Sequence, residues 1–142
     1  MASSLDRLAG LIARLRSRRG CPWDRKQTHL SLIPYLREEA KELEKALRGG
    51  RWHEIEDELG DLLLQVLLHA QIASENGLFD IQDVAKSQHL KLKRRHPHVF
   101  GSRSLRTAEE VLKNWDEIKS SERARRKLEV DRRERRRARP AR

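Results

Sequence analysis

The sequence predicts an all-α protein built as a helical bundle. Apolar residues recur at three- and four-residue steps in several segments, and no segment shows the alternating pattern of a strand. Glycines, prolines and capping residues separate these segments by short connections. With 142 residues, the chain is long enough for one domain with its own core. We therefore expect a single bundle of packed helices.

The first two helices are predicted from their caps and their apolar stripes. Ser3 and Ser4 are good N-caps for a helix that stops at Gly20. The segment CPWDRKQT over 21–28 is expected to be a loop in which Trp23 packs against another element. A second helix is expected from Ser31 to the Gly49-Gly50 pair, with a proline tolerated in its first turn. The two apolar stripes contain Leu5, Leu8, Ile12 and Leu15, and then Leu36, Ala40, Leu43 and Leu47.

The segment from about Trp52 to Ser74 is predicted to be the central helix of the bundle. Its leucine-rich stretch over 59–70 places apolar side chains in nearly every direction around the helix axis. A helix that is apolar on all sides is normally buried. Because one layer of helices would leave part of this surface exposed, we expect a homo-oligomer, either a homodimer or a homotetramer.

Two further helices are expected in the C-terminal half of the chain. Asp80 is placed to cap a helix that runs to about Arg95 and that Pro97 ends. Thr107 and Glu110 have the spacing of a capping box before the last helix. The apolar residues of that helix are Val111, Leu112, Trp115 and Ile118.

Composition excludes several classes of protein. No apolar run approaches the roughly 20 residues that a membrane-spanning helix needs, so no membrane partner is expected. The first 18 residues carry charges among their apolar side chains and lack the apolar core of a secretory signal. Cys21 is the only cysteine, which rules out an internal disulfide. These features predict a cytoplasmic protein.

Most of the formal net charge of +10 lies at the C-terminus. Residues 123–142 contain eleven Lys and Arg residues against three acids. Residues 129–142 include almost no large apolar side chain, so this segment cannot bury enough surface to offset its ordering entropy. We therefore divide the chain into a domain over 1–122 and a basic tail over 123–142 that is disordered or loosely helical. The favoured role of this tail is to aid solubility, and the alternative is an arm that binds nucleic acid.

Acidic residues form a narrow stripe on the predicted second and third helices. Glu39 and Glu42 lie three residues apart on one helix, and Glu58 and Asp61 have the same spacing on the next. Glu54, Gln65 and His69 extend the stripe, and Glu38 points further toward solvent. Burying unpaired carboxylates costs on the order of several kcal/mol each, and no Lys or Arg lies between Trp52 and Lys86 to offset that cost.

A divalent metal ion is the interpretation that best explains this stripe. Two pairs of carboxylates on adjacent helices supply the hard oxygen ligands that suit Mg²⁺ or Mn²⁺. The alternative is that these residues are ordinary surface acids, as in most isolated ExxE motifs. A ferritin-like di-iron centre needs Glu-x-x-His motifs, which this sequence lacks.

A metal held by carboxylates often shares its coordination with phosphate, which calls for cations nearby. Lys91 and Arg95 lie four residues apart on the predicted fourth helix, and Lys119 follows Trp115 by one turn on the fifth. Each feature has an ordinary alternative as a solvated charge or a core aromatic residue. The histidines at 96 and 98 are interpreted as part of a structural loop rather than a zinc site.

Five blocks of the sequence together resemble the MazG family of nucleoside triphosphate pyrophosphohydrolases. They occur in the family's order and cover about residues 5–122 in a single copy, whereas many family members carry two. The blocks are CPWDRKQTH (21–29), REEAKELE (37–44), EDELGDLLLQVLLHAQIA (56–73), KLKRRHPHVFG (91–101) and LKNWDEIK (112–119).

The resemblance implies a MazG-like four-helix core and Mg²⁺-dependent hydrolysis of nucleoside triphosphates (NTP or dNTP) to monophosphate and pyrophosphate. Its metal ligands, carried over by position, are Glu39, Glu42, Glu58 and Asp61. Glu38 is a candidate for orienting water. The family's nucleotide-binding positions fall on Lys91, Arg95, Trp115 and Lys119.

Two other functions compete with a pyrophosphohydrolase that cleans the nucleotide pool. One is a basic helical module that binds nucleic acid without catalysis, and the other is a helical interaction protein whose acids are merely solvated. The acidic stripe argues against the first, because inward-facing acids repel phosphates unless a metal intervenes.

Overall fold

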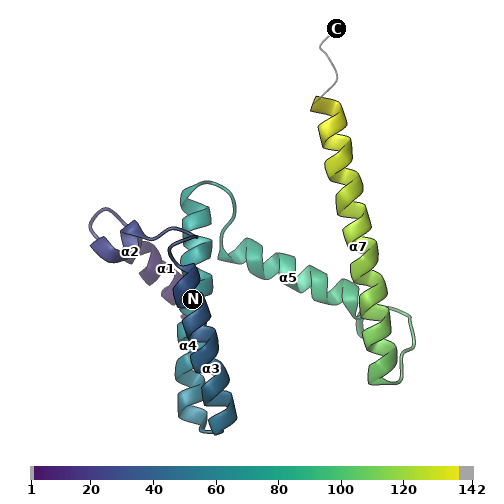
Figure 1. Ribbon diagram of the computed structural model, residues 1–142, viewed down its shortest axis with the longest axis horizontal. Helices are drawn as coiled ribbons and strands as arrows, with labels where there is room; N and C mark the ends of the chain where they lie inside the picture. Colours follow the sequence, from purple (N-terminus) through teal and green to yellow (C-terminus); the bar gives the residue numbers. More distant parts are fainter. Residues whose placement is uncertain (1, 138–142) are drawn as a thin grey trace. The chain divides into compact units, whose positions relative to one another are not determined.

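The structure is a computed structural model that describes residues 2–137, with side chains described as far as Arg132. All regular secondary structure in this range is helical, which confirms the all-α prediction (Figure 1). The chain divides into two compact units, Met1–Lys86 and Ser87–Arg142. No helix within residues 2–137 combines the length and the apolar character needed to cross a membrane.

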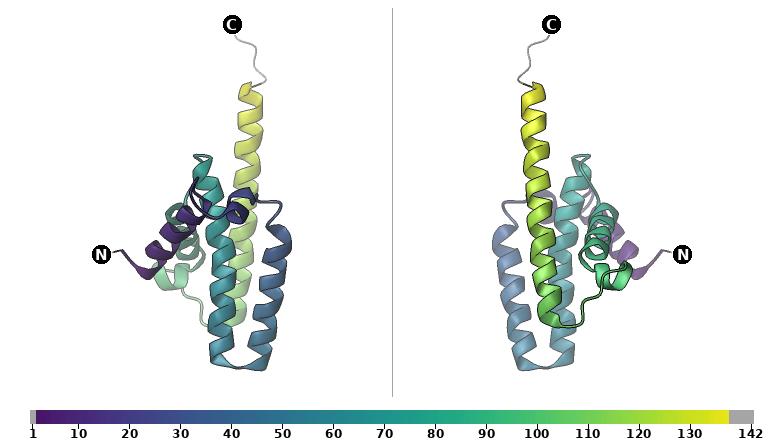
Figure 2. Two further views of the ribbon diagram at one scale, coloured as in Figure 1. Left: turned by 90° about the vertical axis from the view of Figure 1, so that its left-hand side faces the viewer. Right: turned by 90° about the vertical axis from the view of Figure 1, so that its right-hand side faces the viewer.

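Four helices form the body of the first unit. Helices α3 and α4 pack side by side as an antiparallel hairpin, α1 packs against α4, and α2 packs against α1 (Figure 2). The hairpin is the framework on which the acidic residues are displayed. The bounds of the helices are Ser4–Arg16 for α1, Pro22–Lys26 for α2, Ile33–Gly49 for α3 and Trp52–Glu75 for α4.

Local sequence signals explain where these helices begin and end. Ser3 and Asp6 form a reciprocal capping box at the start of α1, as the serine caps predicted. Helix α3 ends at Gly50, whose φ of 69° is the left-handed conformation that glycine adopts without steric cost. Helix α1 ends at Arg16, one turn before the predicted stop at Gly20.

The sequence predicted a loop over 21–28. The structure instead has the short helix α2 within this segment. Pro22 starts this helix because its fixed φ suits the first turn, where a missing N–H costs no hydrogen bond. Trp23 contacts Tyr35 edge-on with ring centroids 5.4 Å apart, which confirms that it packs against another element.

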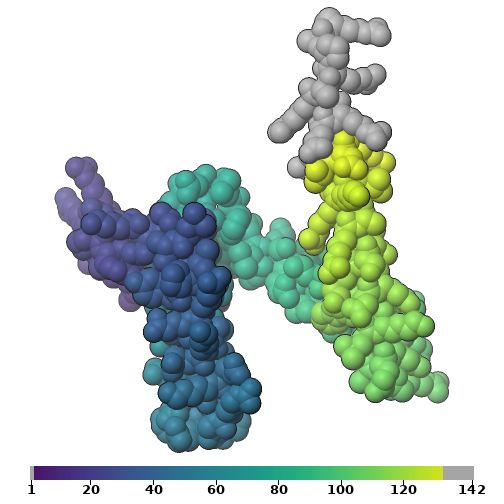
Figure 3. Space-filling view, in the orientation of Figure 1, coloured from purple at the N-terminus to yellow at the C-terminus, as the bar shows by residue number. Residues whose placement is uncertain are grey.

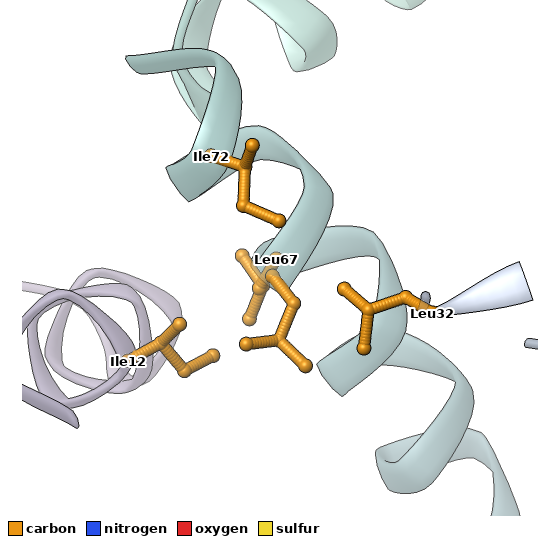
Figure 4. Close-up of a cluster of buried hydrophobic side chains, with 5 residues drawn as sticks. Ile12, Leu32, Leu67 and Ile72 are labelled. Atoms are coloured by element: carbon orange, nitrogen blue, oxygen red, sulfur yellow. The ribbon is translucent and has the colours of Figure 1, made fainter. Parts of the chain in front are cut away.

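The core of the first unit lies where α1, α4 and the start of α3 meet. Ile12 of α1 and Leu32, which precedes α3, are almost completely buried against α4 (Figure 4). Burying each such side chain stabilises the fold by about 1.5–3 kcal/mol. The three core residues from α4 are Leu67, Leu68 and Ile72.

A salt bridge between Arg16 and Glu75 joins the ends of α1 and α4. The Arg16 guanidinium donates two hydrogen bonds to the Glu75 carboxylate, at 2.9 and 2.8 Å. Its remaining Nη1 donates to the carbonyl oxygens of Asp24 and Gln27 around the end of α2. A single arginine therefore holds three helices, because its planar fork presents donors on two edges.

Helix α4 is buried on one side only within this chain. The side chain of Leu59 remains 51% exposed and that of Val66 42%, and Leu63 between them is also exposed. Within the first unit, part of this apolar helix is therefore uncovered, as the sequence predicts for a single layer of helices. The reason is that α1 and α3 cover only part of its circumference in the first unit.

The C-terminal part of the chain contains α5 (Ile81–Arg95), α6 (Pro97–Phe100) and α7 (Ala108–Arg137). Asp80 caps α5 reciprocally with Asp83, and Pro97 ends it, as predicted. At α7 only half of the predicted capping box forms. The Thr107 hydroxyl accepts from the Glu110 amide, but the Glu110 carboxylate accepts from the Arg106 amide instead of that of Thr107.

Helix α7 continues without interruption beyond residue 122. Residues 123–137 of the predicted tail are therefore helical, and residues 138–142 lie outside the described range. In Figure 3 the described part of α7 is drawn in green to yellow, and the residues drawn in grey lie beyond it. Residues 123–130 are exposed, Leu128 and Val130 included, so this segment buries almost no apolar surface.

One buried carboxylate ties α7 to α5 in the second unit. Glu122, only 9% exposed, accepts hydrogen bonds from both Arg94 and Arg95, at 2.8 and 2.7 Å. These hydrogen bonds lower the pKa of the Glu122 carboxyl to about 2, that of Arg95 having the largest effect and burial opposing them. The carboxylate is therefore charged at neutral pH.

The lowered pKa of Glu122 predicts a component of acid unfolding. The carboxylate contributes stability above the ordinary glutamate pKa of 4.5, and this contribution is lost as the pH falls from 4.5 toward 2. Between about pH 5 and about pH 3 the Tm of the wild-type protein should therefore fall further than that of Glu122→Gln. Glu117→Gln, an exposed change on the same helix, should show the wild-type fall. An equal fall in wild type and Glu122→Gln, followed by circular dichroism, would contradict this assignment.

Candidate functional site

Three carboxylates converge on one side of the α3–α4 hairpin. Glu39 comes from α3, and Glu58 and Asp61 come from successive turns of α4. One oxygen from each of them lies within 4.8 Å of the others. The side-by-side packing of the two helices brings these acids together although up to 22 positions separate them in the sequence.

The surroundings of this acidic triad favour the protonated form of two of its members. Partial burial is the main cause that raises the pKa of Glu39, and the charges of Asp61, Glu38 and Glu58 raise it further. Burial, followed by the charge of Asp61, also raises the pKa of Glu58. A cation placed among these oxygens would remove the repulsion, because it favours the ionised form of each carboxyl.

The two remaining predicted acids lie at the margin of the triad. Glu42 is close enough to raise the pKa of Glu58, but it is not among the three residues whose oxygens converge. Its carboxylate is 3.9 Å from the ammonium of Lys45 on the next turn. Glu38 is exposed and acts on Glu39 only through its charge. The structure therefore brings together three of the four predicted metal ligands.

A basic side chain from the neighbouring helix partly offsets the acidic stripe. The charge of Lys45 on α3 lowers the pKa of Glu58, and Glu54 is paired with Arg51 at 2.6 Å. The expectation that no Lys or Arg between Trp52 and Lys86 offsets the acids holds for that segment. It considered only the sequence of the third helix, whereas α3 and the residue before α4 supply these cations.

The donor set of the triad fits a divalent metal ion. Carboxylate oxygens are hard ligands, and Mg²⁺ is bound through one or two carboxylates with water or phosphate in the remaining positions. The triad contains no sulfur or nitrogen donor that would favour a softer metal. Glu39 and Glu58 are half-buried and Asp61 is exposed, so the triad remains open to a ligand.

Beyond Asp61, the polar stripe continues along α4 into the interior. Gln65 is 5% exposed, and its side-chain oxygen has no hydrogen-bond partner among the described residues. One turn further, His69 stacks on His29 with ring centroids 5.1 Å apart and an Nδ1 to Nδ1 distance of 2.8 Å. Burial, together with the charge of His29, lowers the pKa of His69.

The predicted nucleotide-binding residues all lie in the second unit. The Arg95 guanidinium lies over the ring of Trp115, 5.6 Å from its centroid, and His96 contacts the same ring edge-on at 4.9 Å. Lys119 is paired with Asp116 at 2.9 Å. Lys91 is half-buried on α5. The structure confirms that a cation and an aromatic platform are adjacent here, although the cation on the ring is Arg95 rather than Lys119.

Sequence reasoning missed two features of these sites. The contact between His29 and His69 joins residues 40 positions apart, so no local pattern predicts it. Glu122 was placed at the edge of the basic tail, where a single acid among arginines looks like an ordinary surface charge. Its spacing of three residues from Lys119 and seven from Trp115 was the available signal that it lies on nearly the same side of α7.

Comparison with known proteins adds family relationships to this geometry. The family model described as the MazG nucleotide pyrophosphohydrolase domain matches residues 27–100. A nucleoside triphosphate pyrophosphohydrolase of Escherichia coli (strain K12) is 44% identical over 123 residues, which are 86% of this chain and 47% of that protein. The nucleoside triphosphate pyrophosphohydrolase/pyrophosphatase MazG of Thermotoga maritima is 48% identical over 122 residues, 86% of this chain and 46% of its own.

A solved structure has a similar fold. The crystal structure of a mazG-related protein from Thermotoga maritima matches 81% of this chain and 98% of its own, with a TM-score of 0.65 and 30% sequence identity. The present chain spans about half the length of the curated relatives it matches. The matched residues include the whole acidic triad, and on this basis the chain belongs to the MazG nucleotide pyrophosphohydrolase domain family.

Proposed function

We propose that this protein is a Mg²⁺-dependent nucleoside triphosphate pyrophosphohydrolase that releases a nucleoside monophosphate and pyrophosphate. The observation that carries the proposal is the convergence of Glu39, Glu58 and Asp61 on the α3–α4 hairpin. The relatives named as nucleoside triphosphate pyrophosphohydrolases support the same reaction. A role in cleaning the cytoplasmic pool of NTPs or dNTPs would follow from it.

In this mechanism the chain's own carboxylates hold the metal and orient the reaction. Glu39, Glu58 and Asp61 would hold Mg²⁺, or Mn²⁺ in its place, and Glu42 at the margin of the triad would be the fourth ligand. When bound, the ion supplies charge neutralisation on the phosphates and lowers the pKa of a coordinated water. Glu38 is a candidate for orienting that water, and no covalent nucleophile from the chain is required.

The second unit supplies the residues that we assign to nucleotide binding. Arg95 and Lys91 offer cations to phosphate oxygens, and the Trp115 ring offers an apolar face. Lys119 joins this set once a ligand phosphate competes with Asp116 for its ammonium. A non-catalytic nucleic-acid module is not favoured, because it gives the converging acids of the first unit no role.

The reaction is tested by resolving products from a panel of canonical and modified triphosphates incubated with Mg²⁺. We expect monophosphate and pyrophosphate in equal amounts, because attack lies between the α and β phosphates, and no product after chelation of the metal. Release of inorganic phosphate with a diphosphate would place attack at the terminal phosphate and contradict the proposal. Absence of turnover over the whole panel would reject it.

The metal ligands are tested by the isosteric changes Glu58→Gln and Asp61→Asn. Each preserves side-chain volume but removes a charge from the triad, so Mg²⁺-dependent turnover should fall by at least about a hundredfold. Without metal, Glu58→Gln should melt no lower than wild type, because it removes the repulsion that raises the pKa of Glu58.

The matched control for these variants is Glu56→Gln. Glu56 is exposed on the same helix and does not belong to the triad. Its turnover and Mg²⁺ dependence should equal those of the wild type. Wild-type rates in Glu58→Gln or Asp61→Asn, with unchanged Mg²⁺ dependence, would show that these residues are not ligands.

We also propose that the exposed apolar stripe of α4 mediates self-association into a homodimer or homotetramer. Leu59, Leu63 and Val66 lie at four- and three-residue steps and therefore on one face of the helix. Light scattering at micromolar concentration should give a multiple of 16.7 kDa. Leu63→Lys should shift the mass toward the monomer, because it places a charge at the centre of that face. A monomeric, fully active wild-type protein would refute the proposal.

A further inference from the structure

Arg95 is held on two sides within the second unit. Its Nη2 donates to Glu122 at 2.7 Å, and the flat face of its guanidinium lies over Trp115. The side chain is 15% exposed, and that of Glu122 is 10% exposed. Because an arginine side chain otherwise samples many rotamers, these contacts preset the direction in which it points.

The hydrogen bonding of Arg95 is nevertheless incomplete. Its Nε is buried and has no acceptor among the described residues. A buried donor without a partner is costly and rare in folded proteins. The contact with Glu122 uses Nη2 only, so the guanidinium retains donors for an anionic ligand.

Glu122 also sets the charge of this cluster. It binds Arg94 at 2.6 Å as well as Arg95, so one negative charge is shared between two positive ones. Arg94, Arg95 and Glu122 together therefore carry a net charge of +1. A carboxylate that served only to neutralise Arg95 would cancel its attraction for phosphate, whereas this shared carboxylate orients Arg95 and leaves positive charge available.

We infer that Glu122 is a positioning residue for nucleotide binding, which fixes the guanidinium of Arg95 for contact with the triphosphate. This inference rests on the proposed function, because it assigns Arg95 to the substrate. Glu122 itself does not touch the nucleotide. Its effect should therefore be on substrate affinity, and it should disappear when Arg95 is absent.

The first measurement compares steady-state kinetics of wild type and Glu122→Gln with Mg²⁺ and the best triphosphate of the panel. A glutamine oxygen accepts from one arginine, but its amide repels the other, so Arg95 loses its fixed orientation. We expect KM to rise about tenfold, the scale of one charge-assisted hydrogen bond, with kcat within about twofold of wild type. An unchanged KM in folded Glu122→Gln would overturn the inference.

The second measurement is a double-mutant cycle with Arg95→Ala. If Glu122 acts through Arg95, adding Glu122→Gln to Arg95→Ala should raise KM no further. Additive effects of the two changes would mean that Glu122 acts independently of Arg95, and they would also overturn the inference.

Two variants separate positioning from simple stabilisation. Arg94→Gln removes an ion pair of Glu122 but keeps the contact with Arg95, so its KM should remain within about twofold of wild type although its Tm falls. If stabilisation were the whole role of Glu122, Arg94→Gln and Glu122→Gln would change KM alike. Glu117→Gln, exposed on the same helix, should leave both KM and Tm unchanged.

If Glu122→Gln loses its helical circular dichroism signal and so fails to fold, the same kinetics are measured with Glu122→Asp. This variant keeps the charge but withdraws the carboxylate by one methylene group. If Glu122 positions Arg95, KM should therefore rise. If only the charge of Glu122 matters, KM should not change. A wild-type protein that hydrolyses no triphosphate would reject the proposed function and this inference together. Normal wild-type turnover with no shift of KM in either variant would reject this inference alone.

Discussion

The packing of α3 against α4 is the interaction on which the candidate metal site depends. Apolar contacts along the hairpin and the core beneath it hold Glu39 next to Glu58 and Asp61, although like charges repel one another. Burial first, and then the charges of the neighbouring acids, raise the pKa values of Glu39 and Glu58. The first unit is therefore most stable when a cation or protons relieve the triad, a cost that a binding site commonly imposes on its scaffold.

The two clusters of charged side chains in this protein carry opposite net charges. In the first unit, acids gather with too few cations, and the site has an unmet demand for positive charge. In the second, two arginines surround one buried carboxylate, and the excess charge is positive. Carboxylates with too few cations favour binding of a cation, and arginines with excess positive charge favour binding of an anion such as phosphate.

Much of the fold was predictable because its signals are local. The serine cap of α1, the glycine that ends α3 and the proline that ends α5 act within one turn of chain and lie where the sequence predicts. The short helix α2 was missed, because one turn of helix leaves no apolar periodicity to detect. The extent of α7 was also underestimated, since arginine favours helix even where nothing packs.

The sequence by itself determined the long helices of the first unit and which of their faces carry the acids, because i,i+3 spacing places Glu58 and Asp61 on one side of any α-helix. Only the tertiary structure decided which acids meet. It brought Glu39 to that pair and left Glu42 aside, and it joined His29 to His69 and Glu122 to Arg95. Contacts between distant residues depend on how helices pack against one another, and that packing is set by the sum of many apolar contacts rather than by any local pattern.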